Sequence, residues 1–211
     1  PNSLTNDYYK MELGNGGITS LFDYTLNKEV IRTTKFSGGD VLTLEYTGTG
    51  AGEFNQMTKP QMRGVFDPNG NSRNEGYDIT SSHISQWRVI NDGNVFTEYE
   101  NITQFKHTQI VQKIKVFHHE KKIDFLIDMI NWDGTHNREF RFALPINMDN
   151  AKIKYEVPLA IAEVGKTEMK EAPKGWSWGG TYDSKPVTIH PREVLNYISS
   201  ETQEFALTLA T

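Results

Sequence analysis

Apolar and polar residues alternate with a period of two along most of this 211-residue chain, and this alternation constrains the fold more than any other feature. Successive side chains of a strand point to opposite faces, so the period is typical of half-buried strands. The clearest example is the pair of runs Thr108–Phe117 and Lys121–Asn131, joined by a connection short enough for a hairpin. No convincing long segment shows the 3.6-residue period of an amphipathic helix.

Turn residues separate most of the other alternating segments, which favours antiparallel neighbours. The further strands that we expect are Tyr8–Leu13, Ile18–Tyr24, Gln86–Ile90, Val95–Tyr99, Phe140–Leu144, Ile153–Val157, Val187–Ile189, Val194–Ser199 and Phe205–Leu209. Two irregular segments, Gly48–Asn74 and Gly165–Lys185, contain scattered aromatic residues and do not look like flexible linkers. So many short strands predict an all-β fold, a sandwich or a barrel, in a single domain over residues 1–211.

Composition excludes several classes of function. The chain has 22 basic and 27 acidic residues, a net charge of −5, which argues against a nucleic-acid partner. No apolar run approaches the roughly 20 residues that a membrane-spanning helix needs, so we expect no membrane partner. The absence of cysteine excludes disulfides and thiolate chemistry. The chain begins at Pro1 and carries no recognisable targeting signal, from which we expect a processed or excised piece.

Acidic and histidine pairs give weak catalytic signals. Glu98 and Glu100 lie about 6.6 Å apart along a strand, inside the window of about 5–9.5 Å for glycosidase carboxylates. A solvent-facing row of carboxylates has the same pattern and is the simpler interpretation. Asp124 and Asp128 are roughly 13 Å apart, too far for such a pair. His118 and His119 are adjacent, so a polar turn is favoured over a metal site.

The most informative loop contains three aromatic residues and a carboxylate, Trp176, Trp178, Tyr182 and Asp183. Flat aromatic faces beside a carboxylate suit the apolar C–H faces and hydroxyls of a sugar. These four residues are therefore the candidate carbohydrate-binding residues. The alternative is that the aromatic side chains hold the loop against the sandwich or against another domain.

An ordered set of motifs extends from about Asp7 to Thr211. They are Gly16–Asp23 followed by Glu29-Val30, the Asn131-Trp132 step, Phe142–Pro145, Tyr155–Leu159, Glu193–Tyr197 and Phe205–Leu209. In order and spacing they resemble the C-terminal β-sandwich region of glycoside hydrolase family 38, the α-mannosidases. The chain departs from the family pattern at Leu159–Glu163, where the family usually has Gly followed shortly by Arg, and at Tyr197, where the family has Trp.

The resemblance implies a large antiparallel β-sandwich of the galactose-mutarotase-like "supersandwich" type. It also implies a parent enzyme that is a zinc-dependent retaining α-mannosidase acting on terminal α-mannosides of glycans. In that family the zinc ligands and the nucleophile belong to a separate catalytic domain, which a helical domain follows. We therefore expect no catalytic residue, metal ligand or cofactor in this chain, and we expect those two domains and a mannose-containing glycan as its partners.

Two other functions stay open on the residues alone. A free-standing sugar-active enzyme of the mutarotase type would need a histidine and a glutamate that converge in a concave face. A carbohydrate-binding or interdomain scaffold module would need neither. The sequence gives no indication of the compartment in which the protein works.

Overall fold

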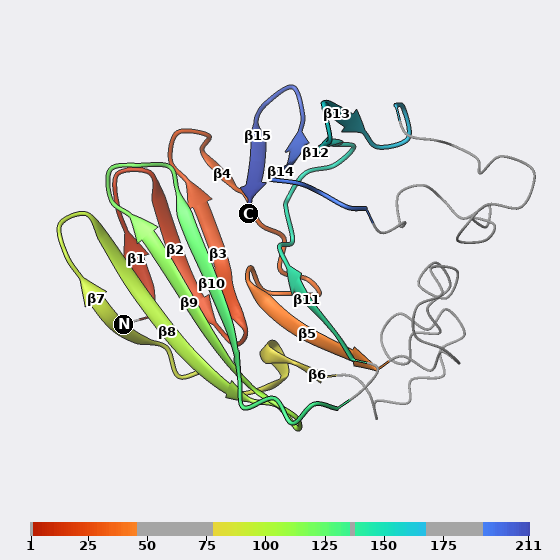
Figure 1. Cartoon of the computed structure of the whole chain (residues 1–211). Helices are drawn as coiled ribbons and strands as arrows, with labels where there is room; N and C mark the ends of the chain where they lie inside the picture. The colour runs from red at the N-terminus through yellow and green to blue at the C-terminus, as the bar shows by residue number, and fades with distance from the viewer. Residues whose placement is uncertain (1, 46–77, 136–137, 168–191) are drawn as a thin grey trace, which may run out of the picture. The chain divides into compact units, whose positions relative to one another are not determined.

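The chain folds into antiparallel β-sheets, as the computed structural model in Figure 1 shows for residues 2–45, 78–135, 138–167 and 192–211. The predicted all-β sandwich class is confirmed. The described residues form two compact units, one of residues 2–45, 78–135 and 138–147 and one of residues 148–167 and 192–211. A single domain over residues 1–211 remains a prediction. No helix in the described residues is long and apolar enough to span a membrane.

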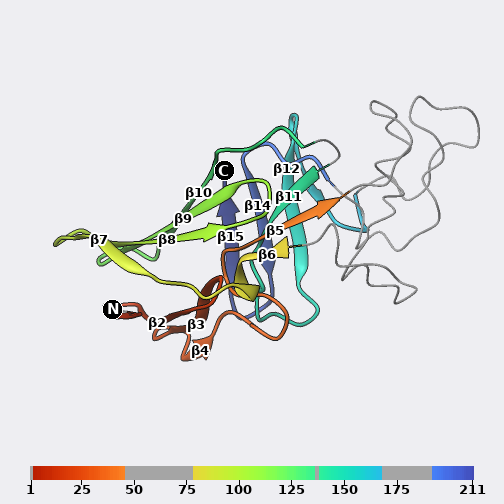
Figure 2. The ribbon, with the colours of Figure 1, turned by 90° about the horizontal axis from the view of Figure 1, so that it is seen from below.

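The first unit contains two four-stranded sheets and one three-stranded sheet, ordered β1-β2-β3-β4, β10-β9-β8-β7 and β11-β5-β6. Its strands are β1 (Ser3–Thr5), β2 (Tyr9–Gly14), β3 (Gly17–Asp23), β4 (Lys28–Glu29), β5 (Asp40–Glu45), β6 (Asp78–Ile79), β7 (Arg88–Asp92), β8 (Phe96–Gln104), β9 (Gln109–Phe117), β10 (Ile123–Ile130) and β11 (Arg138–Ala143). Seen from below in Figure 2, the two four-stranded sheets form separate layers.

The core of this unit follows from the period-two pattern. On β9, the residues Ile110, Gln112, Ile114 and Val116 share one face and are at most 1% exposed. Met11 on β2, in the other four-stranded sheet, is fully buried. Burying a large aliphatic side chain contributes about 1.5–3 kcal/mol, so these inward faces supply the main driving force for the sandwich.

Glycine allows two loops of the first unit to approach each other closely. Ile18 and Gly38 exchange backbone hydrogen bonds of 2.8 and 2.7 Å. Gly16 has a φ of +80°, and a Cβ added there would lie 2.6 Å from a carboxylate oxygen of Asp40. A Cβ on Gly17 would lie 2.2 Å from the carbonyl oxygen of Gly38. The Gly16-Gly17 pair of the opening motif is therefore required by packing as well as by the turn.

Buried amides connect this close approach to the opposite sheet. The Gln112 side chain donates hydrogen bonds of 2.8 and 2.9 Å to the carbonyl oxygens of Gly16 and Gly39. It accepts one of 3.1 Å from Asn101, whose own oxygen accepts the Gln86 N–H at 2.9 Å. Asn101 is only 1% exposed, so the Asn-Ile-Thr glycosylation sequence at this position is inaccessible in the folded unit.

The second unit is one four-stranded sheet, ordered β13-β12-β14-β15. Its strands are β12 (Lys152–Val157), β13 (Ala160–Glu163), β14 (Tyr197–Glu201) and β15 (Ala206–Ala210). Tyr155 lies opposite Ile198, which in turn lies opposite Leu209, so one face of the sheet is apolar. Lys154 and Glu201 form an ion pair of 2.6 Å on the other face. The pairing is amphipathic, as the alternation at residues 152–157 predicts.

The predicted strands that lie in the described residues all appear, with ends that differ by a few residues. The prediction omitted β1, β4, β5, β6 and β13. Val187–Ile189 and almost all of the two irregular segments lie outside the described residues, so those predictions remain untested.

Replacement of Gly16 by Ala is expected to destabilise the first unit more than replacement of Gly134 by Ala. Both glycines have φ near +80°, but a Cβ on Gly134 meets nothing within 4 Å. Left-handed strain alone costs about 1–2 kcal/mol, and crowding against Asp40 and Ser81 adds to it at Gly16. Urea unfolding of both variants measures the difference, and equal losses would contradict the packing role of Gly16.

Candidate functional site

The four predicted carbohydrate-binding residues, Trp176, Trp178, Tyr182 and Asp183, lie outside the described residues. Their role remains a prediction. The candidate groups that the structure does describe are the acidic pairs, the histidines, the carboxylates of the opening motif and an exposed tryptophan after β10.

Glu98 and Glu100 belong to a cross-strand ladder of charges. Glu100 pairs with Arg88 on β7 and lies 3.9 Å from Lys113 on β9. Glu98 lies 3.9 Å from Lys115 on β9. Opposite charges on neighbouring strands stabilise a sheet by roughly 0.2–1 kcal/mol per pair. The ladder gives both carboxylates a structural role, in agreement with the simpler interpretation of their spacing.

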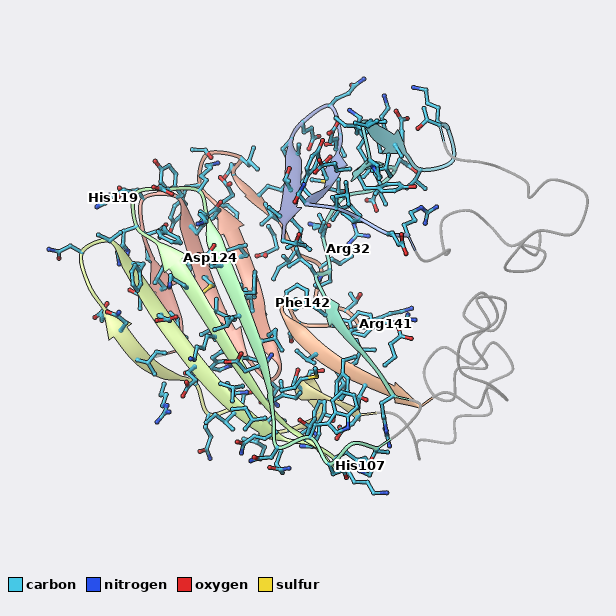
Figure 3. All side chains as sticks on the ribbon, in the orientation of Figure 1. Arg32, His107, His119, Asp124, Arg141 and Phe142 are labelled. Carbon is cyan, nitrogen blue, oxygen red and sulfur yellow. The ribbon has the colours of Figure 1, made fainter. Side chains whose placement is uncertain are left out.

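The histidines lie at separate places in the first unit. Figure 3 shows His119 and His107 at opposite ends of the sheet that contains β9 and β10. His118 lies 3.2 Å from the Thr97 hydroxyl, and the His119 ring lies 3.2 Å from Asp7. No group of three or more His, Cys, Asp or Glu side chains in the described residues can hold a metal ion. The described part of the chain therefore does not offer a zinc site.

The carboxylates of the opening motif connect strands. Glu29 accepts hydrogen bonds from the Leu21 N–H at 2.6 Å and the Ser20 hydroxyl at 2.7 Å, which joins β4 to β3. Asp23 is 4% exposed and receives the Lys121 ammonium at 2.8 Å, from the turn between β9 and β10. Both motif positions are thus explained by local architecture.

Burial alone would raise the pKa of Asp23. Hydrogen bonds from Lys121, from Thr25 and from the backbone N–H of Leu26 outweigh burial and hold the pKa below its ordinary value. A carboxyl group with a lowered pKa stabilises the fold above its unfolded pKa, and this stabilisation is lost as the pH falls through the folded value. Asp23 therefore makes the first unit sensitive to acid.

The segment Asn131–Thr135, here called the Trp132 loop, presents the most exposed tryptophan of the described residues. Trp132 is 41% exposed, and its ring packs edge-on against Phe140 with 5.2 Å between centroids. Asn131 and Gly134 have φ values of 57° and 79°, which bend the backbone so that the ring lies at the surface. An aromatic face fixed on one side and open on the other can stack on the apolar face of a sugar.

Asp133 and His107 hold this loop in place. The Asp133 carboxylate lies 2.6 Å from the His107 Nδ1 and accepts the Thr135 N–H at 2.9 Å. The Asp133 N–H donates to the His107 carbonyl oxygen at 3.1 Å. Hydrogen bonds from the Thr135 hydroxyl, from His107 and from the Thr135 backbone keep the pKa of Asp133 well below its ordinary value. Asp133 thus stays ionised beside Trp132, where it offers an acceptor for sugar hydroxyls.

Sequence reasoning treated His107 as isolated and Trp132 only as part of a motif. The signal that could have joined them is the β9–β10 hairpin itself. Its register places Gln109 opposite Ile130, so residues just before β9 lie beside residues just after β10. Extending the predicted hairpin pairing by two or three residues brings His107 to Asp133.

Antiparallel sheets with charge ladders, buried amide networks and an aromatic loop define an all-β sandwich of the class that accompanies sugar-active enzymes. Residues 4–172 match the family described as "Glycosyl hydrolases family 38 C-terminal domain". The chain therefore belongs to this family, and the resemblance seen in its motifs is confirmed. No curated protein shows significant similarity to the chain.

Replacement of Asp23 by Asn is expected to lower the free energy of unfolding at pH 7 by about 3 kcal/mol, because it breaks a buried ion pair. The wild-type protein should lose stability between about pH 5 and pH 3, and the variant should lose less over the same range. Urea unfolding as a function of pH measures both. Asp124→Asn is the control, since the exposed Asp124–Lys122 pair of 3.3 Å should contribute less than about 1 kcal/mol. Parallel pH profiles for wild type and Asp23→Asn would exclude the assigned role of Asp23.

Replacement of Trp132 by Ala is expected to weaken the binding of a mannose oligosaccharide roughly tenfold, because about 1.4 kcal/mol of ring stacking is lost. The melting temperature should change little, since much of the ring already faces solvent. Titration calorimetry and thermal unfolding measure the two effects. Ile130→Ala, at a neighbouring residue that is 40% exposed, is the control and should leave binding unchanged. Unchanged binding in Trp132→Ala would remove this loop from consideration.

Proposed function

We propose that this chain is a non-catalytic sandwich region of a zinc-dependent retaining α-mannosidase that hydrolyses terminal α-mannosides of glycans. Membership of the family supports a glycoside hydrolase as the parent protein. The observation that carries the non-catalytic assignment is the engagement of the candidate carboxylates in structural contacts. Glu98 and Glu100 lie in the charge ladder, and Asp23 binds Lys121 inside the first unit.

In this proposal the zinc ion and the nucleophile belong to the catalytic domain of the same polypeptide. Zinc would supply Lewis-acid chemistry there. The described residues contribute structure, and their loops lie at the rim of the sugar site. The Trp132 loop is the described candidate for that contact, and Trp176, Trp178, Tyr182 and Asp183 are the candidates outside the described residues. The proposed partners are the catalytic and helical domains and a mannose-containing glycan.

A second function, that of a carbohydrate-binding module, is favoured by the Trp132 loop, which needs no catalytic group. The mutarotase-type alternative receives less support. It requires a histidine paired with a glutamate, whereas His83, His107 and His119 lie beside aspartates and His118 lies beside a threonine. These partners hold the imidazoles in positions where no glutamate shares a proton with them.

The test is hydrolysis of an aryl α-mannoside by the purified chain, with and without added zinc. We expect no turnover above the buffer rate under either condition. Zinc-stimulated turnover by the chain would refute the non-catalytic assignment. Polarimetry of freshly dissolved glucose with the same protein tests the mutarotase alternative, and faster mutarotation would favour that activity. Glycan binding without either activity would support a binding module or a rim domain.

A further inference from the structure

The hairpin between β12 and β13 ends in an unusual turn. Val157 pairs with Ala160, so Pro158 and Leu159 form a two-residue connection. Leu159 has a φ of 64°, in the left-handed region that is unfavourable for a side chain such as Leu. Proline followed by a residue of positive φ is the signature of a type II turn, in which the second position favours Gly or Asn. The backbone therefore does not explain why this position carries Leu.

Comparison within the chain makes the point sharper. The other non-glycine residues with positive φ in the described part of the chain are Asn27, Asn131 and Asn150. Asparagine tolerates this conformation, because its short polar side chain can bond locally. Leu159 alone combines the strained backbone with a large apolar side chain among these four residues. Its side chain is 107% exposed, so contacts within the chain do not account for it either.

Two further apolar residues lie near the turn. Ile161 is 58% exposed and lies opposite Glu156 in the β12–β13 register. Leu195 is 50% exposed, and its N–H donates to the Glu156 carbonyl oxygen at 3.1 Å. Leu159, Ile161 and Leu195 are here called the hairpin-tip patch. Such a group of exposed aliphatic side chains is typical of an interaction surface.

Glu156 gives the hairpin-tip patch a charge. Its carboxylate accepts a hydrogen bond of 3.0 Å from the Asn196 amide, a neutral donor that leaves the negative charge in place. A two-fold contact between copies of this chain would bring the same patch against itself and two Glu156 side chains together, which like-charge repulsion disfavours. Charge complementarity instead requires a lysine or arginine at the rim of the partner site.

We infer that the hairpin-tip patch docks into an apolar recess, rimmed by a basic residue, on another domain of the same polypeptide. The inference rests on the proposed function, which supplies that domain. Leu159 inserts as a knob, and its burial offsets the left-handed strain that the isolated chain carries. The hairpin is thus a point at which the sandwich is fastened to the rest of the enzyme.

The test compares Leu159→Asn in the isolated chain and in the longer polypeptide that carries it. Asn relieves the strain, so the melting temperature of the isolated chain should rise by about 2–4 °C. In the longer polypeptide the same substitution removes the knob, and the melting temperature should fall. Ile84→Asn is the matched control, since Ile84 is 84% exposed and has no positive φ. It should move both temperatures little and in the same direction.

Three outcomes would overturn the inference. The first is an equal rise in both proteins, which would show that the tip is free in the longer polypeptide. The second is the absence of any rise in the isolated chain, which would remove the strain. The third is a dimeric wild-type chain that Leu159→Asn makes monomeric in light scattering, which would identify a second copy as the occupant. Aryl α-mannoside hydrolysis by the longer polypeptide is read separately, so failure of the proposed function is distinguishable from failure of the docking.

Discussion

The close approach of the Gly16-Gly17 turn to the segment Gly38–Asp40 is the constraint on which the first unit depends. Neither loop has space for a Cβ at the crossing, and buried amides fill the hydrogen-bonding requirements around it. Asp40 is fully buried and accepts the Thr80 hydroxyl at 2.6 Å and the Ser37 N–H at 3.1 Å. A buried carboxylate is stable only with such partners, so the polar centre and the glycine turn require each other.

This constraint changes the meaning of the family motif at the start of the chain. Its glycines allow the crossing, Asp23 ties β3 to the turn between β9 and β10, and Glu29 joins β4 to β3. The motif thus records how two sheets are fastened together. The same holds for Glu98 and Glu100, whose spacing resembles a catalytic pair but whose partners are Lys115, Arg88 and Lys113. In the described residues the acidic positions serve the architecture.

The sequence predicts what local physics determines. The runs that form β8, β9 and β10 alternate strictly and are joined by short turns, so their existence and pairing follow from pattern alone. β5 could not be paired in this way, because its partner β11 lies about a hundred residues further along the chain. The ionic partner of Asp23 is similarly distant. The His107–Asp133 contact lies between these cases, since it follows from the hairpin register but from no motif.

The account assigns support and attachment to this chain, with chemistry elsewhere in the parent enzyme. The most direct measurement is kcat of the longer polypeptide carrying Glu98→Gln and Glu100→Gln together. Loss of the charge ladder should lower the melting temperature by a few degrees while kcat stays within about twofold of the wild-type value. A fall in kcat of a thousandfold or more at an unchanged melting temperature would show that these carboxylates act in catalysis, and would contradict the account.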